Sequence, residues 1–447
     1  MEQTKNHLFK IGARYRNRTP KSPEEYLQAV YKAERTLRES QLENSDGIYW
    51  NAQIEGKSDL SLYTGSAGIL FFYLQLYRFD SKKEYRKIIE DAAKYVAKHW
   101  RELPTTPTDL FTTLNLGFYV GYAGVGHVLC EVYDAFHNED IKNTVVDIVE
   151  LYRDKAVSAS EGIYWSDNTS LLLDGGVILF LLRAYEILKD SSIKEIISAA
   201  ADYLISKGIP HEEGMEFDGF APVSGETRPN FEFGSAGNGF LFLKLYEEFK
   251  EEKYLALAKA CADYVLSLKV PQEKGYLIPY TTRQSEPIYY LSTCHGPAGT
   301  SRLFYELYKV TGDESYLSVI TDLTDGLEAV GAPEKQSKGF WNNVCLCCGN
   351  AGLVQFFVGM YQSTRKDYWL TLARRAGNVL LGESESDDQN NIYWLIAYTR
   401  VQPEIITKDL GYYNGLAGIA AVLLQLYLAE TDKFQCIRLI DDPFPSK

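Results

Sequence analysis

The sequence predicts an all-α fold, an α/α toroid (barrel) of seven helical hairpins with inner and outer helix rings. Three observations lead to this prediction: a glycine signature that occurs seven times, an apolar stretch after each copy, and amphipathic stretches between copies. Such self-similarity is typical of repeat architectures, in which each unit buries its apolar face against its neighbours. A closed ring has no natural internal boundary. We therefore expect a single domain over residues 1–447.

Each copy of the signature ends in a tyrosine nine residues beyond its second glycine. The stretch between them is apolar on nearly every face, which is typical of a helix enclosed by neighbours. We expect these seven stretches to form the inner ring, with small residues letting backbones crowd together at one end. The copies start at Gly65, Gly121, Leu173, Gly234, Gly296, Gly349 and Gly415.

The stretches between the copies predict the outer ring. Those starting at Ser81, Ser191 and Glu251 carry polar residues along one stripe, as a helix with one solvated face does. The segment from Ser22 has the same pattern and starts with a serine cap followed by proline. It supplies the outer helix that closes the ring. The repeated GIYW at Gly47 and Gly162 predicts short turns or hairpins between helices.

Composition and charge exclude several classes of protein. With 45% hydrophobic and 24% charged residues, the chain is typical of a globular protein with a sizeable core. The net charge of -14 opposes a phosphate backbone, so we expect no nucleic-acid partner. No apolar run approaches the ~18–20 residues that span a bilayer, and the basic, polar start is not a signal peptide. A cytoplasmic location with no membrane span follows as the expectation.

Three of the seven cysteines predict a metal site. An odd, unevenly spaced set is a poor disulfide framework. Cys294 lies two residues before Gly296, and Cys347 lies two residues before Gly349 in the next unit. Equivalent positions of adjacent units lie side by side in a ring, so we expect these two sulfurs and that of Cys348 to converge where the inner helices begin.

Zinc is the cation that this set favours. Thiolates prefer zinc among the available divalent ions, and three protein ligands with one open position are typical of catalytic sites. The open position can bind a further thiol and lower its pKa, which gives a nucleophile at neutral pH. We interpret Cys345 as a packing residue or a spare thiol. Cys130, Cys261 and Cys436 are expected to be inert small hydrophobes on helical faces.

His295 stands beside Cys294 at the same end of the ring. It could coordinate metal, act as an acid or base, or cap a helix; a fourth protein ligand would close the site, so we favour a role other than metal ligation, with acid–base work and capping both open. Four further polar residues near the glycine turns either line this mouth or serve as caps and turn residues. They are Asp174, Glu232, Asn238 and Asn414.

At these residues the sequence resembles the lanthionine synthetase C (LanC) and LanC-like family. The motif Thr293-Cys294-His295-Gly296 matches the family's Trp-Cys-His/Tyr-Gly apart from the tryptophan, and Cys347-Cys348-Gly349 matches its Cys-His-Gly or Cys-Cys-Gly. The resemblance covers all seven repeats. It implies an α/α toroid that holds Zn²⁺ through Cys294, Cys347 and Cys348. It also implies addition of a cysteine thiol to dehydroalanine or dehydrobutyrine, which forms a thioether.

Three positions depart from the family's pattern. The chain has Phe233 where the cyclases have a histidine, Gly117 where they have an aspartate, and Tyr290 where they have an arginine. The resemblance implies that these groups handle protons and the enolate. Their loss leaves the implied metal ligands in place, and His295 becomes the candidate catalytic proton donor.

Three functions remain open from the sequence. The first is a zinc-dependent enzyme that joins a thiol to a dehydrated precursor peptide, or couples a small thiol such as glutathione to dehydroamino acids. If it cyclises peptides, a separate dehydratase is its expected partner. The second is a carbohydrate-active toroid, for which Asp218, Glu226 and Glu232 are candidate carboxylates. The third is a non-catalytic, zinc-containing peptide-binding scaffold.

Overall fold

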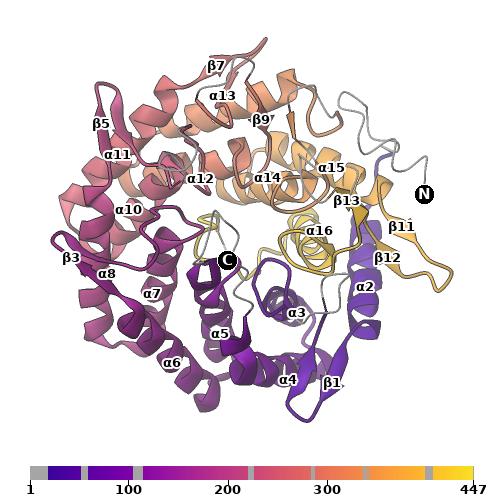
Figure 1. The fold of residues 1–447 in the computed structure, drawn as a ribbon. Helices are drawn as coiled ribbons and strands as arrows, with labels where there is room; N and C mark the ends of the chain where they lie inside the picture. The colour runs from indigo at the N-terminus through magenta and orange to yellow at the C-terminus, as the bar shows by residue number, and fades with distance from the viewer. Residues whose placement is uncertain are drawn as a thin grey trace.

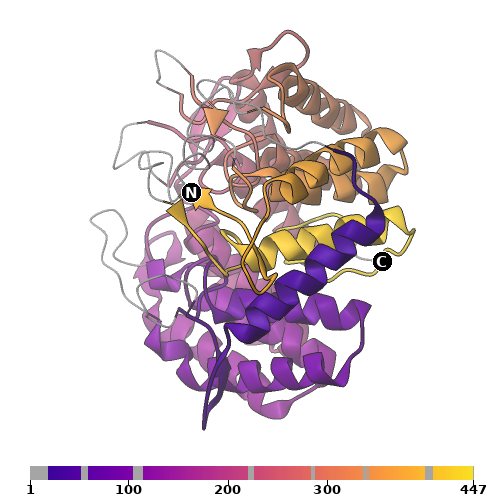
Figure 2. The ribbon, with the colours of Figure 1, turned by 90° about the vertical axis from the view of Figure 1, so that its right-hand side faces the viewer.

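Two concentric rings of helices surround a central axis in the computed structural model (Figure 1). The structure describes residues 19–51, 59–103, 114–219, 226–282, 287–335, 340–341, 343–397 and 406–445. Inner and outer helices alternate along the chain, as the repeat predicted. The side view shows the helices running roughly along the axis of the ring, with the hairpins and most connecting loops gathered at one end (Figure 2).

The inner ring consists of the seven helices that follow the glycine signature. Each begins directly after the residue at which its copy starts, and most of its side chains are buried. The prediction of helices enclosed on all sides is therefore confirmed. They are α3 (Ser66–Phe79), α5 (Tyr122–Phe136), α7 (Asp174–Leu188), α10 (Ser235–Phe249), α12 (Pro297–Thr311), α14 (Asn350–Thr364) and α16 (Leu416–Glu430).

The outer ring is amphipathic, also as predicted. Its first helix starts at the expected serine: Ser22 and Glu25 form a reciprocal capping box, and proline occupies the first turn. That helix packs against α16, and α16 packs against α3, so the two ends of the chain meet and close the ring. The outer helices are α2 (Pro23–Glu39), α4 (Lys83–His99), α6 (Glu139–Lys155), α8 (Ser191–Ser206), α11 (Glu252–Ser267), α13 (Ser315–Ala329) and α15 (Asp367–Gly382).

Short β-hairpins follow several outer helices, which confirms the interpretation of the GIYW segments. Gly47 and Gly162 have φ angles of 136° and 145°, a region that favours glycine. The tryptophan that ends each segment, Trp50 or Trp165, donates its indole N–H to a carbonyl near the end of the preceding outer helix. The hairpin pairs are β1 (Leu42–Asn44) with β2 (Gly47–Tyr49), β3 (Val157–Ala159) with β4 (Gly162–Tyr164), β5 (Ile209–His211) with β6 (Gly214–Glu216), β7 (Val270–Pro271) with β8 (Tyr276–Leu277), and β11 (Glu385–Ser386) with β12 (Ile392–Tyr393).

The remaining short elements lie near the same end of the ring. Strands β9 (Tyr289–Tyr290) and β10 (Phe340–Trp341) pair in parallel, and β13 (Ile396–Ala397) pairs antiparallel with β14 (Ile406–Thr407). Two turns of 3₁₀ helix, η1 (Trp100–Glu102) and η2 (Leu114–Leu116), connect α4 to the second repeat. Among the described helices, none is long and apolar enough to cross a membrane.

A belt of backbone hydrogen bonds joins the seven units just before the inner helices begin. In each described unit an N–H donates to a carbonyl of the next unit, with N···O distances of 2.8 to 3.2 Å, and the last unit bonds back to the first. We call this set the mouth belt. Its links run from Tyr63 to Tyr119, Phe118 to Leu172, Leu171 to Glu232, Glu232 to Cys294, Cys294 to Cys347, Cys347 to Tyr413, and Tyr413 to Tyr63.

The second glycine of each signature makes the mouth belt possible. This glycine lies directly against the backbone of the loop that forms the belt. A Cβ atom on Gly124 would come within 1.8 Å of the Phe118 carbonyl oxygen and 3.0 Å of Leu62 Cβ in the preceding unit. Only a residue without a side chain lets the loop fold so tightly over its own helix. The glycine signature is therefore a packing requirement of the ring.

The described residues that follow α16 turn back into the ring toward its axis (Figure 1). We call residues 436–444 the tail. All of them except Asp441 line a cavity of about 530 Å³ together with residues of several inner helices, at the end of the ring away from the mouth belt. Cys436 belongs to this tail, so its predicted place on a helical face is wrong.

Substituting Gly124 with alanine should lower the free energy of unfolding by about 1–3 kcal/mol, because the new methyl group overlaps the Phe118 carbonyl. Denaturant unfolding followed by circular dichroism measures the change. Gly312→Asn is the matched control: its φ is 71°, which asparagine tolerates, and no heavy atom lies within 4 Å of the point that its Cβ would occupy. It should stay within about 0.5 kcal/mol of wild type. Equal losses in both variants would contradict the packing role of the signature.

Candidate metal centre

The structure brings the sulfurs of Cys294, Cys347 and Cys348 together at the mouth belt. Cys348 Sγ lies 3.5 Å from Cys294 Sγ and 3.4 Å from Cys347 Sγ, and all three lie within 4.8 Å of one another. They come from two adjacent units, just before α12 and α14. Among the described residues, this is one of two groups of His, Cys, Asp or Glu side chains with such spacing; the other is Glu232, Cys294 and His295.

The three sulfurs fit a tetrahedral zinc ion. A Zn–S bond of about 2.3 Å places two sulfurs of a tetrahedron about 3.8 Å apart, close to the sulfur–sulfur distances of 3.4 and 3.5 Å. Cys294 and Cys347 are buried, whereas Cys348 is partly exposed. The set thus has the residue type and spacing of a three-thiolate site, with one of its three cysteines partly exposed.

Backbone contacts hold each sulfur in place. The N–H groups of Thr293 and Cys294 both donate to the Cys347 carbonyl, and the Cys347 N–H donates to the Tyr413 carbonyl at 3.0 Å. The Cys348 N–H points to the sulfur of Cys345 at 3.4 Å, so Cys345 supports a neighbour from a fully buried position. The three neighbouring cysteines therefore have different roles. Cys345 is buried and packs under the loop, whereas the sulfurs of Cys347 and Cys348 join that of Cys294 in the cluster.

The protonation of the cluster is uneven. Hydrogen bonds from the thiols of Cys294 and Cys348 hold the pKa of Cys347 well below its usual value. Burial raises the pKa of Cys294. Hydrogen bonds that the thiol of Cys348 shares with Cys294 and Cys345 raise its pKa. A divalent ion bound by all three sulfurs would favour their deprotonated form.

His295 is buried in an aromatic box. Phe233 stacks on its ring at 4.6 Å, while Tyr280 and Tyr290 meet it edge-on at 4.9 and 5.3 Å. Its Nδ1 is buried without a hydrogen-bond partner in the described structure. Burial, with a smaller effect from Arg228, lowers the pKa of His295 to about 3. The imidazole is therefore neutral at neutral pH.

Glu232 is a carboxyl group that lies beside the cluster, within 4.8 Å of the ligand atoms of Cys294 and His295. Its Oε2 lies 3.8 Å from His295 Nε2, and it lines a small cavity beside Cys294 and Cys347. Burial raises its pKa well above the usual value, and the charge of Cys347 adds to the effect. From the sequence alone, Glu232 is explained equally well as a turn or cap residue and as a residue that lines the mouth. The signal that distinguishes it is its position two residues before the glycine of its unit, the same position as Cys294 and Cys347.

The other polar candidates serve the turns. Asp174 accepts hydrogen bonds from the backbone of Trp165 and Ser166. Asn238 donates to the Gly234 carbonyl, and Asn414 donates to Asp409. The turn interpretation explains these contacts without a ligand.

Tyrosines from other units complete the wall of the small cavity. Tyr63, Tyr119 and Tyr413 line it together with Phe231, Glu232, Thr293, Cys294 and Cys347. The three tyrosines also stand two residues before the starting glycines of their units. Sequence reasoning singled out the cysteines at this position but missed the tyrosines, although the repeat alignment places them in the same layer.

Comparison with known proteins identifies the family. The sequence model of a family described as "Lanthionine synthetase C-like protein" matches residues 56–439. The chain belongs to this family. It is 23% identical over 365 residues to the lacticin 481/lactococcin biosynthesis protein LcnDR2 of Lactococcus lactis subsp. lactis, a match that covers 78% of this chain and 36% of the relative. The chain thus spans about a third of the length of that relative.

Solved structures share the fold. Nisin cyclase superposes with a TM-score of 0.58 at 14% identity, covering 92% of this chain and 98% of the cyclase. A structure of UGL with the ligand dGlcA-Glc-Rha-Glc gives a TM-score of 0.50 at 14% identity, covering 91% and 96%. At such identities the likeness shows the α/α toroid alone. The shared fold therefore does not distinguish between the candidate functions. The choice between them depends on the side chains at the mouth.

The three departures from the LanC pattern have structural reasons. A Cβ atom on Gly117 would come within 2.1 Å of the Leu172 carbonyl oxygen, so this backbone leaves no room for an aspartate. Phe233 and Tyr290 both pack on His295. The side chains that replace the family's histidine and arginine thus enclose the imidazole with aromatic surface.

In folded, metal-free protein, iodoacetamide should modify the adjacent Cys347 and Cys348 of the cluster and leave Cys130 and Cys261 intact. Those two side chains are fully buried, and burial raises the pKa of both thiols. Peptide mapping by mass spectrometry identifies the modified residues. Zinc added first should protect the cluster, whereas equal modification of Cys130 or Cys261 in the folded protein would contradict this assignment.

Proposed function

We propose that this protein is a zinc-dependent LanC-like enzyme that adds a thiol to dehydroalanine or dehydrobutyrine. The observation that carries the proposal is the convergence of three cysteine sulfurs from two repeats within 4.8 Å. Cys294, Cys347 and Cys348 would hold the ion. Bound zinc supplies a site where the substrate thiol loses its proton near neutral pH and becomes a nucleophile.

The reaction forms one bond between the substrate sulfur and the β-carbon of the dehydroamino acid. The electrons of the carbon–carbon double bond move to the α-carbon, where an enolate forms and then takes a proton. The proton lost by the thiol balances the one gained at the α-carbon. The product is a thioether, and no oxidant or reductant is needed.

Glu232 and His295 are the chain's own groups for handling these protons. They lie 3.8 Å apart beside the sulfur cluster, which is close enough for one water or a substrate atom to bridge them. Since His295 is neutral, it acts through its ring N–H and its lone pair. The aromatic box of Phe233, Tyr280 and Tyr290 fixes the ring and excludes water from one side of it.

The acceptor is either a dehydrated precursor peptide or a free dehydroamino acid that couples with a small thiol such as glutathione. Membership of the family and the biosynthetic relative favour a peptide. A separate dehydratase would then act first, and we place the protein in the cytoplasm. The carbohydrate-active alternative has weaker support, because Asp218 accepts a hydrogen bond from the Arg228 backbone at 2.7 Å and Glu232 belongs to the thiol site.

Metal analysis tests the site. Purified wild type should contain close to one zinc ion per chain, and Cys347→Ala should lose most of it, because two remaining thiolates bind the ion far more weakly. Cys261→Ala is the control, since that buried thiol lies on an outer helix. Wild type without zinc after purification in zinc-containing buffer, or full zinc in Cys347→Ala, would reject the assigned ligands.

Two substitutions test the proton-handling groups. His295→Asn and Glu232→Gln should each retain zinc and lower the rate of thiol addition by roughly 100-fold or more, the range that general acid–base catalysis contributes. A dehydroalanine peptide and a thiol, followed by mass spectrometry, give the rate. Unchanged turnover in His295→Asn would remove His295 from the mechanism, and the same result in Glu232→Gln would remove Glu232.

A further inference from the structure

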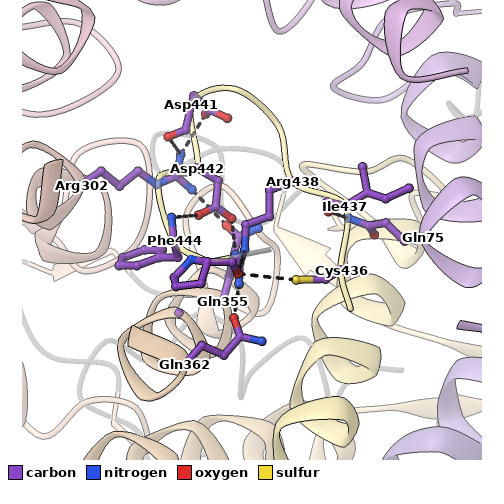
Figure 3. A network of polar contacts seen from close by, with 12 residues as sticks. Gln75, Arg302, Gln355, Gln362, Cys436, Ile437, Arg438, Asp441, Asp442 and Phe444 are labelled. Carbon is purple, nitrogen blue, oxygen red and sulfur yellow. Dashed lines mark hydrogen bonds and ion pairs between the residues drawn. The ribbon is translucent and has the colours of Figure 1, made fainter. Parts of the chain in front are cut away.

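The tail carries two buried ion pairs into the ring. Arg302 Nη1 lies 2.8 Å from Asp441 Oδ2, and Arg438 Nη1 lies 2.5 Å from Asp442 Oδ2. All four side chains are at most 4% exposed. Figure 3 shows Arg302 reaching across from α12 to the tail, while Arg438 folds back onto the tail itself. Burial of this kind is costly unless each charge keeps its partner.

Asp441 also connects the tail to the wall of the thiol site. Its Oδ2 accepts hydrogen bonds from the hydroxyls of Tyr119 at 3.0 Å and Tyr413 at 3.4 Å. The Tyr413 carbonyl in turn accepts the N–H of Cys347 at 3.0 Å. Two hydrogen bonds and one tyrosine therefore separate Asp441, near the end of the chain, from a metal ligand.

The tyrosines form one aromatic unit. Tyr413 stacks on Tyr63 with ring centroids 5.6 Å apart, and it meets Tyr119 edge-on at 5.1 Å. Tyr63 lines the same small cavity as Cys347. The orientation of Tyr413 thus affects Cys347 along two routes, through its own carbonyl and through the ring of Tyr63.

Asp442 makes no such connection. Besides Arg438, its described hydrogen bond is to the Phe444 N–H at 3.3 Å, within the tail. Arg438 continues to Gln362 and to the Pro445 carbonyl. The two adjacent aspartates therefore have similar burial and a similar ion pair, but only Asp441 is bonded to side chains that line the thiol site. They form a matched pair for experiment.

We propose that Asp441 is a positioning residue for the metal centre and that it acts through Tyr413 and Tyr119. The inference rests on the proposed zinc site. Asp441 keeps both hydroxyls directed into the ring, which holds the Tyr413 backbone under Cys347 and the Tyr63 ring beside its sulfur. Partners that orient metal ligands in this way change metal affinity by about 10–100-fold when they are removed.

The test compares Asp441→Asn with Asp442→Asn. Zinc affinity is measured by competition with a chromophoric chelator, and the thiolate-to-cobalt absorption bands of the Co²⁺-substituted proteins report ligand geometry. Asp441→Asn should weaken zinc binding by about 10-fold or more and shift the cobalt bands. Asp442→Asn should bind zinc within twofold of wild type and keep its spectrum, although both metal-free variants lose stability in denaturant.

A second variant covers the case in which Asp441→Asn does not fold. Tyr413→Phe removes one hydroxyl from Asp441 without leaving Arg302 unpaired, and it keeps the ring and the carbonyl that binds Cys347. It should weaken zinc binding by severalfold. Unchanged zinc affinity in Tyr413→Phe would contradict the proposed route. Where Asp441→Asn does fold, the double variant should lose less affinity than the product of the two single losses.

The outcomes separate the inference from the function it rests on. Wild type that binds no zinc at the three cysteines would overturn both. Wild type that binds zinc, with equal affinity and equal spectra in both aspartate variants, would overturn the role of Asp441 alone. Strictly multiplicative effects of Asp441→Asn and Tyr413→Phe would overturn it as well.

Discussion

The mouth belt is the constraint on which the site depends. Seven backbone hydrogen bonds link the units in a circle at one layer of the ring, and the last unit bonds back to the first. The belt brings together side chains of residues that are far apart in sequence, such as Tyr63, Glu232 and Cys347. Each hydrogen bond of the mouth belt joins backbone atoms and involves no side chain. The residue types in the belt can therefore differ from unit to unit while the backbone geometry stays the same.

This arrangement explains how much of the fold the sequence predicts. The glycines repeat because a Cβ atom at Gly124 or its equivalents has no space, so the signature marks every inner helix without reference to side-chain chemistry. The outer helices follow from their polar stripe, and the ring closure follows from the capped helix after Ser22. The return of the tail into the ring carries no such periodic signal, so the sequence alone wrongly predicts a helical position for Cys436.

The sequence predicted site residues only where an uncommon residue type occupies equivalent positions in adjacent repeats. Cys294 and Cys347 stand out because cysteine is rare and both occupy the same position of adjacent units. Tyr119 and Tyr413 occupy that position too, but tyrosine is common in this chain, with 33 copies, so register alone did not distinguish them. The aromatic box of His295 depends on Tyr280 and Phe233 from loops before two different helices, and only the fold brings these together.

The central claim is that two neighbouring repeats supply three sulfurs to one ion and leave a fourth position open. X-ray absorption at the zinc edge of the purified wild-type protein measures the ligands directly. We expect three sulfurs at about 2.3 Å and one oxygen or nitrogen at about 2.0–2.1 Å, with that lighter ligand replaced by a fourth sulfur when a small thiol is added. A spectrum with two or fewer sulfurs, or one unchanged by thiol, would contradict it.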